Sequence, residues 1–268
     1  MKKYVIVFIA LFMVSGCEDV VEIDVPKDST RLSIDALVRI DTSEPTTHIA
    51  VKAMGTTGFF EEIEPAVLDR IQLLDTSTNT MKDLVEDPSG SGIYVADWST
   101  SGLVQGDFQL NILYNNEQYE AMATFVPTVP FDVLEQGDDT LFSEGETEIV
   151  LSYTDEADNE DYYLFDFGFN LYLVSEDTFY PGESFEFSYF YEDGLETGRE
   201  LNISILGIDK GFYDYMGQLI AQSGGDQGPF QTPTATVRGN IINTTDPDNL
   251  AFGYFALCQE YKGTVVIE

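Results

Sequence analysis

Hydrophobic and polar residues alternate with a period of two through most of the chain after residue 30, which is typical of β-strands. In the segment 32–40, five apolar residues at even positions alternate with Ser33, Asp35, Leu37 and Arg39. Asn115 and Asn116 separate two such runs and predict a tight hairpin turn. The runs in this part of the chain are 32–40, 47–54, 67–75, 92–97, 108–114 and 119–125. Because no helical pattern separates them, we expect a β-sandwich of antiparallel strands that spans residues 31–127.

The second half, residues 132–268, follows Pro127-Thr128-Val129-Pro130 and is also predicted to be an antiparallel β domain, richer in aromatic residues. The pattern predicts one long strand over 162–173. One face of it is apolar and predicted to lie in the core: Tyr163, Phe165, Phe167, Phe169, Leu171 and Leu173. The opposite face is mixed and supplies four candidate ligand-binding residues: Tyr162, Asp166, Asn170 and Tyr172. Further alternating runs lie at 149–153, 185–191 and 201–205.

A single helix is expected at about 209–222. Its apolar residues recur at helical spacing and form one stripe: Phe212, Tyr215, Met216, Leu219 and Ile220. Asp209 is a suitable N-cap, and Ser223-Gly224-Gly225 is a suitable end. We interpret the stripe as a face packed on the sheet, with a partner-binding groove as the alternative. The predicted fold is therefore mainly β with one α-helix.

The first residues have the features of a bacterial lipoprotein signal peptide. Lys2 and Lys3 precede an apolar run over 4–14, which is too short to span a bilayer. Val14-Ser15-Gly16-Cys17 resembles a lipobox, so we predict a signal peptide over 1–16 and lipidation of Cys17 with a diacylglycerol and an N-acyl chain such as palmitate. Residues 17–30 would form an acidic tether. Two or three acyl chains anchor a protein stably in a membrane.

Charge narrows the possible partners. The chain has 12 Lys and Arg against 48 Asp and Glu, a net charge of -36. This balance excludes an electrostatic nucleic-acid binder and adsorption to anionic lipid through a basic patch. Glu18 and Asp19 directly after the lipidated cysteine resemble the surface-export signal of Bacteroidota lipoproteins, which favours exposure on the cell surface.

Few residues offer catalytic or metal chemistry. One histidine and two cysteines exclude multi-histidine sites, disulfide scaffolds and cysteine-rich clusters. We expect His48 to lie at the surface and Cys258 to be a buried free thiol. The acidic run 155–161 makes Asp155, Asp158 and Asp161 candidate Ca²⁺ ligands, although its spacing does not match an EF-hand and a solvated acidic turn is the favoured interpretation. Otherwise no cofactor is expected.

Several fragments in sequence order resemble a known family. These are Cys17-Glu18-Asp19-Val20, Gly92-Ile93-Tyr94, the 106–119 hairpin, Pro127 to Asp132, Tyr162-Tyr163, Tyr213-Asp214-Tyr215, Pro229-Phe230, Pro233, Val237 to Ile241, and Gly253-Tyr254-Phe255. The family consists of Bacteroidota outer-membrane lipoproteins, classed as a numbered domain of unknown function, that typically accompany TonB-dependent receptors.

The resemblance implies a two-part β protein with an immunoglobulin-like N-terminal sandwich, and it supplies no catalytic residues. Within the block 237–241, we interpret Gly239-Asn240 as a backbone bend, with Gly239 supplying a positive φ and Asn240 a side-chain cap. A ligand contact by Asn240 is the alternative.

Three functions fit the sequence. The leading hypothesis is a non-enzymatic accessory to a TonB-dependent receptor that binds a ligand or the receptor and helps nutrient uptake. The second is an adhesion or envelope-structural module at the cell surface. The third is a hydrolase with two carboxylates, which would need two carboxyl groups about 5–9 Å apart in a cleft.

Overall fold

The computed structural model describes residues 30–56, 63–142, 145–157, 160–177, 182–192, 194–223 and 236–268. The protein is mainly β, with 55% of the described residues in strands and 9% in helices, so the predicted fold class is confirmed. The signal peptide, Cys17, nearly all of the tether, Asp158 and the 229–233 block lie outside the described residues.

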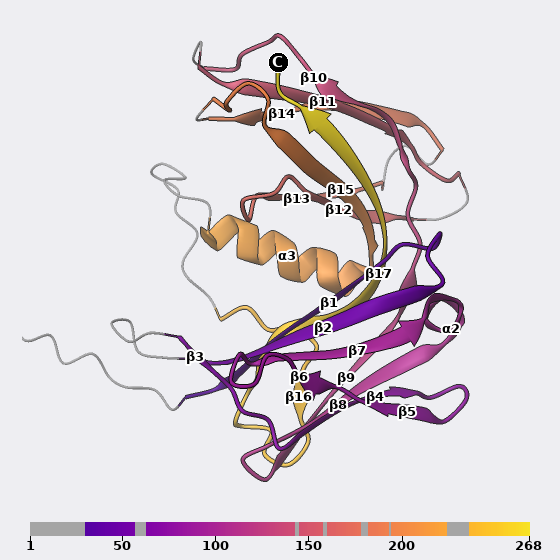
Figure 1. Ribbon diagram of the computed structural model, residues 1–268, viewed down its shortest axis with the longest axis vertical. Coiled ribbons are helices and arrows are strands. Elements are labelled where there is room, and N and C mark those ends of the chain that lie inside the picture. Colours follow the sequence, from indigo (N-terminus) through magenta and orange to yellow (C-terminus); the bar gives the residue numbers. More distant parts are fainter. Residues whose placement is uncertain are drawn as a thin grey trace, which may run out of the picture.

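Two facing layers form the N-terminal half (Figure 1). The first sheet contains β1 (Leu32–Ile40), β2 (Thr46–Gly55), β3 (Glu64–Pro65), β6 (Val85–Glu86) and β7 (Ile93–Ser99). The second contains β4 (Arg70–Asp75), β5 (Thr80–Asp83), β8 (Asp107–Tyr114), β9 (Glu117–Val126) and β16 (Ile242–Asn243). The predicted β8–β9 hairpin is confirmed, with Asn115 at φ 53° and Asn116 at φ 63°. A short helix, α2 (Thr100–Gln105), was not predicted.

The alternating pattern explains the N-terminal core. Even positions of β1, from Leu32 to Ile40, are buried, while its odd positions point to the other side. They join the buried residues of β2 and β8 in one cluster, where Trp98 meets Phe108 edge-on at 5.4 Å between ring centroids. The odd positions of β1 point outward, and their side chains line the candidate functional site.

The C-terminal half contains a smaller sheet, a second sheet arm and one helix. The three-stranded sheet is β10 (Phe131–Gln136), β11 (Thr147–Thr154) and β14 (Ser184–Tyr191). It packs on β12 (Tyr162–Asp166), β13 (Tyr172–Glu176) and β15 (Glu200–Ile208), and aromatic rings such as Tyr153, Phe165 and Phe187 fill the core between them. The predicted strands at 149–153, 185–191 and 201–205 are confirmed.

The last strand, β17 (Phe252–Val266), joins the two halves. Its first part pairs in parallel with β1 and, at Leu257 and Cys258, with β9; its second part pairs antiparallel with β15 (Figure 1). Phe255 and Leu257 are buried in the N-terminal core, whereas Val265 is buried in the C-terminal one. Through β17, all strands except β10, β11 and β14 belong to one 14-stranded sheet, which is mixed and not purely antiparallel as expected. The period-two pattern predicts strands but not the direction of their partners.

The prediction of one long strand over 162–173 is wrong. Strand β12 ends at Asp166, and a tight turn returns the chain as β13, with Asp166 opposite Tyr172. Three consecutive residues of the turn, Gly168, Phe169 and Asn170, have positive φ. Reversal puts the end of the predicted apolar face partly in solvent: the exposed fractions of Phe169, Leu171 and Leu173 are 51%, 36% and 37%.

Helix α3 (Lys210–Ser223) is close to its predicted bounds, and Asp209 caps it by accepting a hydrogen bond from the backbone N–H of Phe212 at 2.8 Å. Phe212 is buried against residues of β12, β15 and β17. In Figure 1 the helix lies on the concave side of the curved strand β17. Among the described helices none has the length and apolarity that crossing a membrane requires.

Candidate functional site

A cleft with a volume of about 510 Å³ lies between α3 and the outer face of the first sheet. We call it the α3 cleft. It is lined by Ser33, Ile34, Asp35, Leu37, Arg39, Ala50, Lys52, Ile93, Leu164, Tyr172, Phe212, Tyr215, Met216, Leu219, Gly253 and Tyr254. Its volume falls within the range of about 300–1,000 Å³ that is typical of small-molecule sites.

Charged residues of two neighbouring strands form the floor of the cleft. Asp35 and Arg39 occupy outward positions of β1, and Lys52 of β2 stands directly opposite Asp35 in the strand register. They face the cleft because their neighbours at even positions of β1 are taken up by the N-terminal core. The floor therefore presents both signs of charge to a ligand.

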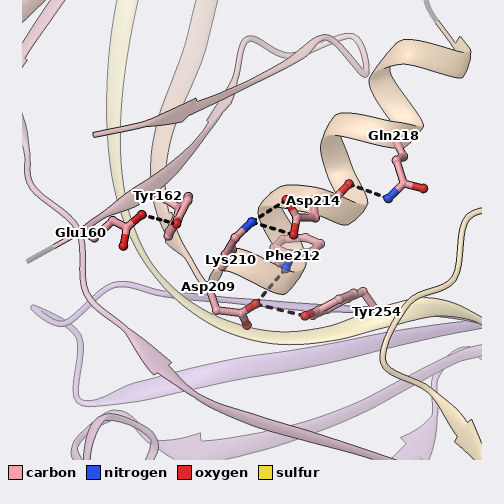
Figure 2. Close-up of polar contacts among 8 residues, drawn as sticks. All are labelled: Glu160, Tyr162, Asp209, Lys210, Phe212, Asp214, Gln218 and Tyr254. Carbon is pink, nitrogen blue, oxygen red and sulfur yellow. Dashed lines mark hydrogen bonds and ion pairs between the residues drawn. The ribbon is translucent and has the colours of Figure 1, made fainter. Parts of the chain in front are cut away.

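Aromatic rings form the wall. The rings of Phe212 and Tyr215 pack on the ring of Tyr254 at centroid distances of 4.8 and 5.2 Å. The Tyr254 hydroxyl lies 3.1 Å from Asp209 Oδ1, the same oxygen that caps α3 (Figure 2). The wall is thus fixed to the start of the helix by one carboxylate, which limits how far Tyr254 can move.

An ion cluster adjoins the cleft at Arg39. The Arg39 guanidinium donates to Asp166 Oδ2 at 2.5 Å and to Glu260 Oε1 at 3.0 Å. Burial by itself would lower the pKa of Arg39, but the hydrogen bond and charge of Asp166 and those of Glu260 outweigh it, so the pKa is raised. The cluster links β1 to the end of β12 and to β17, and it keeps Arg39 charged.

The cleft tyrosines stay protonated. Burial, followed by the charge of nearby carboxylates, raises the pKa of Tyr172, Tyr215 and Tyr254 above the ordinary value. Their hydroxyls are therefore neutral at any physiological pH and offer hydrogen bonds rather than charge. Among the residues that line the described cleft, Asp35 is the one carboxylate.

A family model described as "Domain of unknown function (DUF4249)" matches residues 18–264. The chain is a DUF4249 protein. The match confirms the predicted membership of a numbered family of unknown function and covers every element described above except the last two residues of β17. No curated protein matches this DUF4249 chain in sequence.

The four candidate binding residues of the 162–173 segment are not brought together. Tyr172 lines the cleft, whereas Asp166 lies outside the lining and forms an ion pair with Arg39. Tyr162 lies outside the cleft lining, where its ring packs on Tyr213 at 5.1 Å and its hydroxyl donates to Glu160 at 2.8 Å (Figure 2). Asn170 is exposed in the tight turn.

Asn240 binds the backbone of β17. Its Oδ1 accepts from the N–H of Phe255 at 2.8 Å, and its Nδ2 donates to the carbonyl of the same residue at 2.8 Å. The side chain thus bridges to a neighbouring strand, whereas the expected cap was a local one within the bend. The positive φ expected at Gly239 is wrong; glycine is required because a Cβ there would lie 1.6 Å from the carbonyl oxygen of Gly253.

One of the three candidate metal ligands, Asp155, has protein partners. Asp155 is buried and accepts hydrogen bonds from the Tyr163 hydroxyl and, at 3.1 Å, from the N–H of Gly182. Burial, with the charges of Asp155 and Glu156, raises the pKa of Asp161. Within the described residues no group of three His, Cys, Asp or Glu side chains has a metal-binding arrangement, and Asp158 lies outside them.

The single histidine and the second cysteine lie as predicted. His48 is exposed on β2 with its Nδ1 2.8 Å from Asp97 Oδ1, and Cys258 is a buried free thiol. Burial raises the pKa of Cys258, so the thiol is unreactive.

Sequence reasoning missed most of the cleft. The pattern predicts Asp35 and Arg39 only as the polar side of a strand, Lys52 lies in the predicted run 47–54 without a role of its own, and Tyr254 belongs only to a family fragment. Leu37 between Asp35 and Arg39 on the outward side of β1 is no signal of the cleft, because single apolar residues are common on protein surfaces. The predicted apolar stripe of α3 has two roles. Phe212 is buried in the core, and Tyr215, Met216 and Leu219 line the cleft.

Proposed function

We propose that this DUF4249 protein is a non-enzymatic outer-membrane lipoprotein that binds a nutrient and serves a TonB-dependent receptor in its uptake. The α3 cleft carries the proposal, because it combines small-molecule volume with an aromatic wall and a floor of mixed charge. The predicted lipidation of Cys17 and the family resemblance support the location and the receptor partner.

The cleft chemistry suits a polar molecule with an apolar face. Phe212, Tyr215 and Tyr254 offer ring faces, and neutral tyrosine hydroxyls offer hydrogen bonds. Asp35 and Lys52 add one charge of each sign. No step of bond making or breaking is part of the proposal, so binding and release are the whole of the expected activity.

The receptor partnership is tested by purifying the tagged, lipidated protein from its own outer membrane in a mild detergent. Mass spectrometry is expected to find a TonB-dependent receptor in a near one-to-one ratio. A Cys17→Ser variant, which cannot be lipidated, is the control and should not recover the receptor from the membrane fraction. Recovery of the lipidated protein alone contradicts a stable uptake complex, and an attachment defect in a deletion strain would then favour the adhesion function.

Ligand binding by the cleft is tested separately with two matched tyrosine variants of α3. Tyr215 lines the cleft, whereas Tyr213 packs on Tyr162 away from its lining. Native mass spectrometry of protein purified from its host is expected to show a co-purified small molecule on the wild type and on Tyr213→Ala, but not on Tyr215→Ala. Equal occupancy of both variants, or no bound molecule on any of the three, contradicts the cleft as the binding site.

A further inference from the structure

A second hollow, with a volume of about 480 Å³, lies at the β12–β13 turn and shares no lining residue with the α3 cleft. We call it the Arg199 pocket. It is lined by Phe169, Leu171, Tyr189, Phe190, Tyr191, Glu192, Leu195 and Arg199. Three strand ends meet here: the turn after β12, the end of β14 and the residue that precedes β15.

Phe169 is held in this pocket at a cost to stability. It has φ 53°, a region that bulky residues rarely occupy, and 51% of the residue is exposed. Left-handed backbone at a residue other than glycine is strained, and such strain concentrates at ligand sites. A turn selected only to reverse the chain would place glycine or asparagine here, as at the neighbouring Gly168 and Asn170.

Arg199 lies on the Phe169 ring, with its Cζ 4.5 Å from the ring centroid. Its backbone is fixed, because Ile267 accepts from Gly198 at 2.7 Å and donates to the Arg199 carbonyl at 3.0 Å. Within the described part of the chain Arg199 forms no ion pair, although acids outnumber bases 48 to 12. A guanidinium stacked in this way keeps its N–H donors in its own plane, available to a planar acceptor.

The walls beside Arg199 are rigid and apolar. The Tyr189 ring stacks on Phe167 at 3.8 Å, and the Tyr191 hydroxyl donates to the Phe167 carbonyl at 2.6 Å. These contacts orient both rings before any ligand arrives, which lowers the entropic cost of binding. Together with Leu171 and Leu195 they form a surface for an apolar body.

We propose that the Arg199 pocket binds a small molecule that carries one carboxylate on an apolar or aromatic body. The guanidinium forms paired hydrogen bonds with the carboxylate, and the ring walls take the body. A single arginine beside Glu192, in a chain of net charge -36, does not balance a dianion, so a phosphate is not the expected group. This inference is independent of the proposed function of the α3 cleft.

The test uses the whole chain from residue 17 with Cys17→Ser, so that no lipid is attached. Isothermal titration calorimetry compares 3-phenylpropionate with its neutral amide, 3-phenylpropionamide. We expect the acid to bind about tenfold more tightly or better, as for hydrogen bonds to a charged group. Arg199→Gln is expected to abolish this preference and leave the amide affinity within about twofold.

Two further variants make the outcome specific. Arg70→Gln removes the same charge from an exposed position of β4 and is expected to leave the acid preference intact. Arg199→Lys keeps the charge but not the planar fork, and we expect most of the preference to be lost; it also serves if Arg199→Gln fails to fold. The proposal is overturned by equal affinity for acid and amide, by no binding up to about 10 mM, or by a preference that survives Arg199→Gln.

Discussion

Asn240 provides both hydrogen bonds to the backbone of Phe255, a residue that is itself fully buried. Asn240→Ala leaves a backbone N–H and carbonyl of β17 without these partners, so we expect a loss of about 1–3 kcal/mol in the free energy of unfolding. Urea denaturation monitored by circular dichroism measures it. Asn202→Ala, which removes one exposed contact with Thr264, should change stability by less than about 0.5 kcal/mol; equal effects would contradict the role given to Asn240.

Glu117 illustrates a carboxylate that stabilises the fold through hydrogen bonds. The bond from the Tyr119 hydroxyl, and then those from Asn249 and Asn243, lower its pKa below the ordinary 4.5. Because the folded pKa is the lower one, its contribution is present above pH 4.5 and is lost as the pH falls through the folded value.

We therefore expect Glu117→Gln to be less stable than the wild type at pH 7, and the difference in denaturation midpoint to shrink as the pH falls below about 4.5. Chemical denaturation at several pH values measures it. A difference that stays constant from pH 7 to pH 3 would show that the charge of Glu117 is not what the three donors stabilise.

At the scale of single elements, glycine has opposite roles in β15 and α3. A Cβ on Gly207 would lie 1.8 Å from the carbonyl oxygen of Pro127, a residue in the segment that connects the two halves. A Cβ on Gly217 would meet only Val174, at 3.9 Å. The first glycine is required by packing, whereas the second only lowers the helix propensity of α3.

Gly207→Ala should accordingly destabilise the protein by about 1–3 kcal/mol, and Gly217→Ala should stabilise it by about 0.5–1 kcal/mol. Thermal unfolding of the two variants, which add the same methyl group, measures both shifts. If the two shifts have the same sign, the close approach of residue 127 to β15 is wrong.

Strands and helix could be predicted from local pattern, because burial of one face imposes a period of two or of 3.6 on each element. The turn at 168–170 is missed because the alternation continues through it and outweighs the turn residues Gly168 and Asn170. The cleft could not be predicted either: Asp35 and Lys52 meet Tyr215 and Tyr254 only after β17 has placed α3 over β1. A sequence pattern predicts which face of one strand or helix is apolar, whereas the cleft forms between the faces of two different elements.

At the scale of the whole molecule, β17 belongs to both hydrophobic cores. The Arg39 cluster adds a polar link between β1, β12 and β17. Two halves that share a continuous strand and an ion cluster cannot separate without breaking both, so we expect them to unfold together. The residue ranges predicted for two domains stay a prediction, and a measurement of whether the two halves unfold together tests it.

Trp98, the one tryptophan, reports on the N-terminal core alone. Ile205→Ala removes a fully buried side chain from the C-terminal core and should cost about 2–5 kcal/mol. We expect the Trp98 fluorescence transition in urea to shift by as much as the transition seen by circular dichroism. An unshifted Trp98 transition would show that the halves unfold independently.

The position of β17 in the chain also sets the order of events on the ribosome. Ser33 of β1 is paired with Phe252 of β17. One edge of β1 therefore lacks its hydrogen-bonding partner until β17 has been synthesised. Until about the final 15 residues have been synthesised, the nascent N-terminal layers lack a central member and keep an open β edge. Contacts between such distant positions slow folding. We therefore expect the N-terminal layers to complete their strand pairing only after β17 has been synthesised.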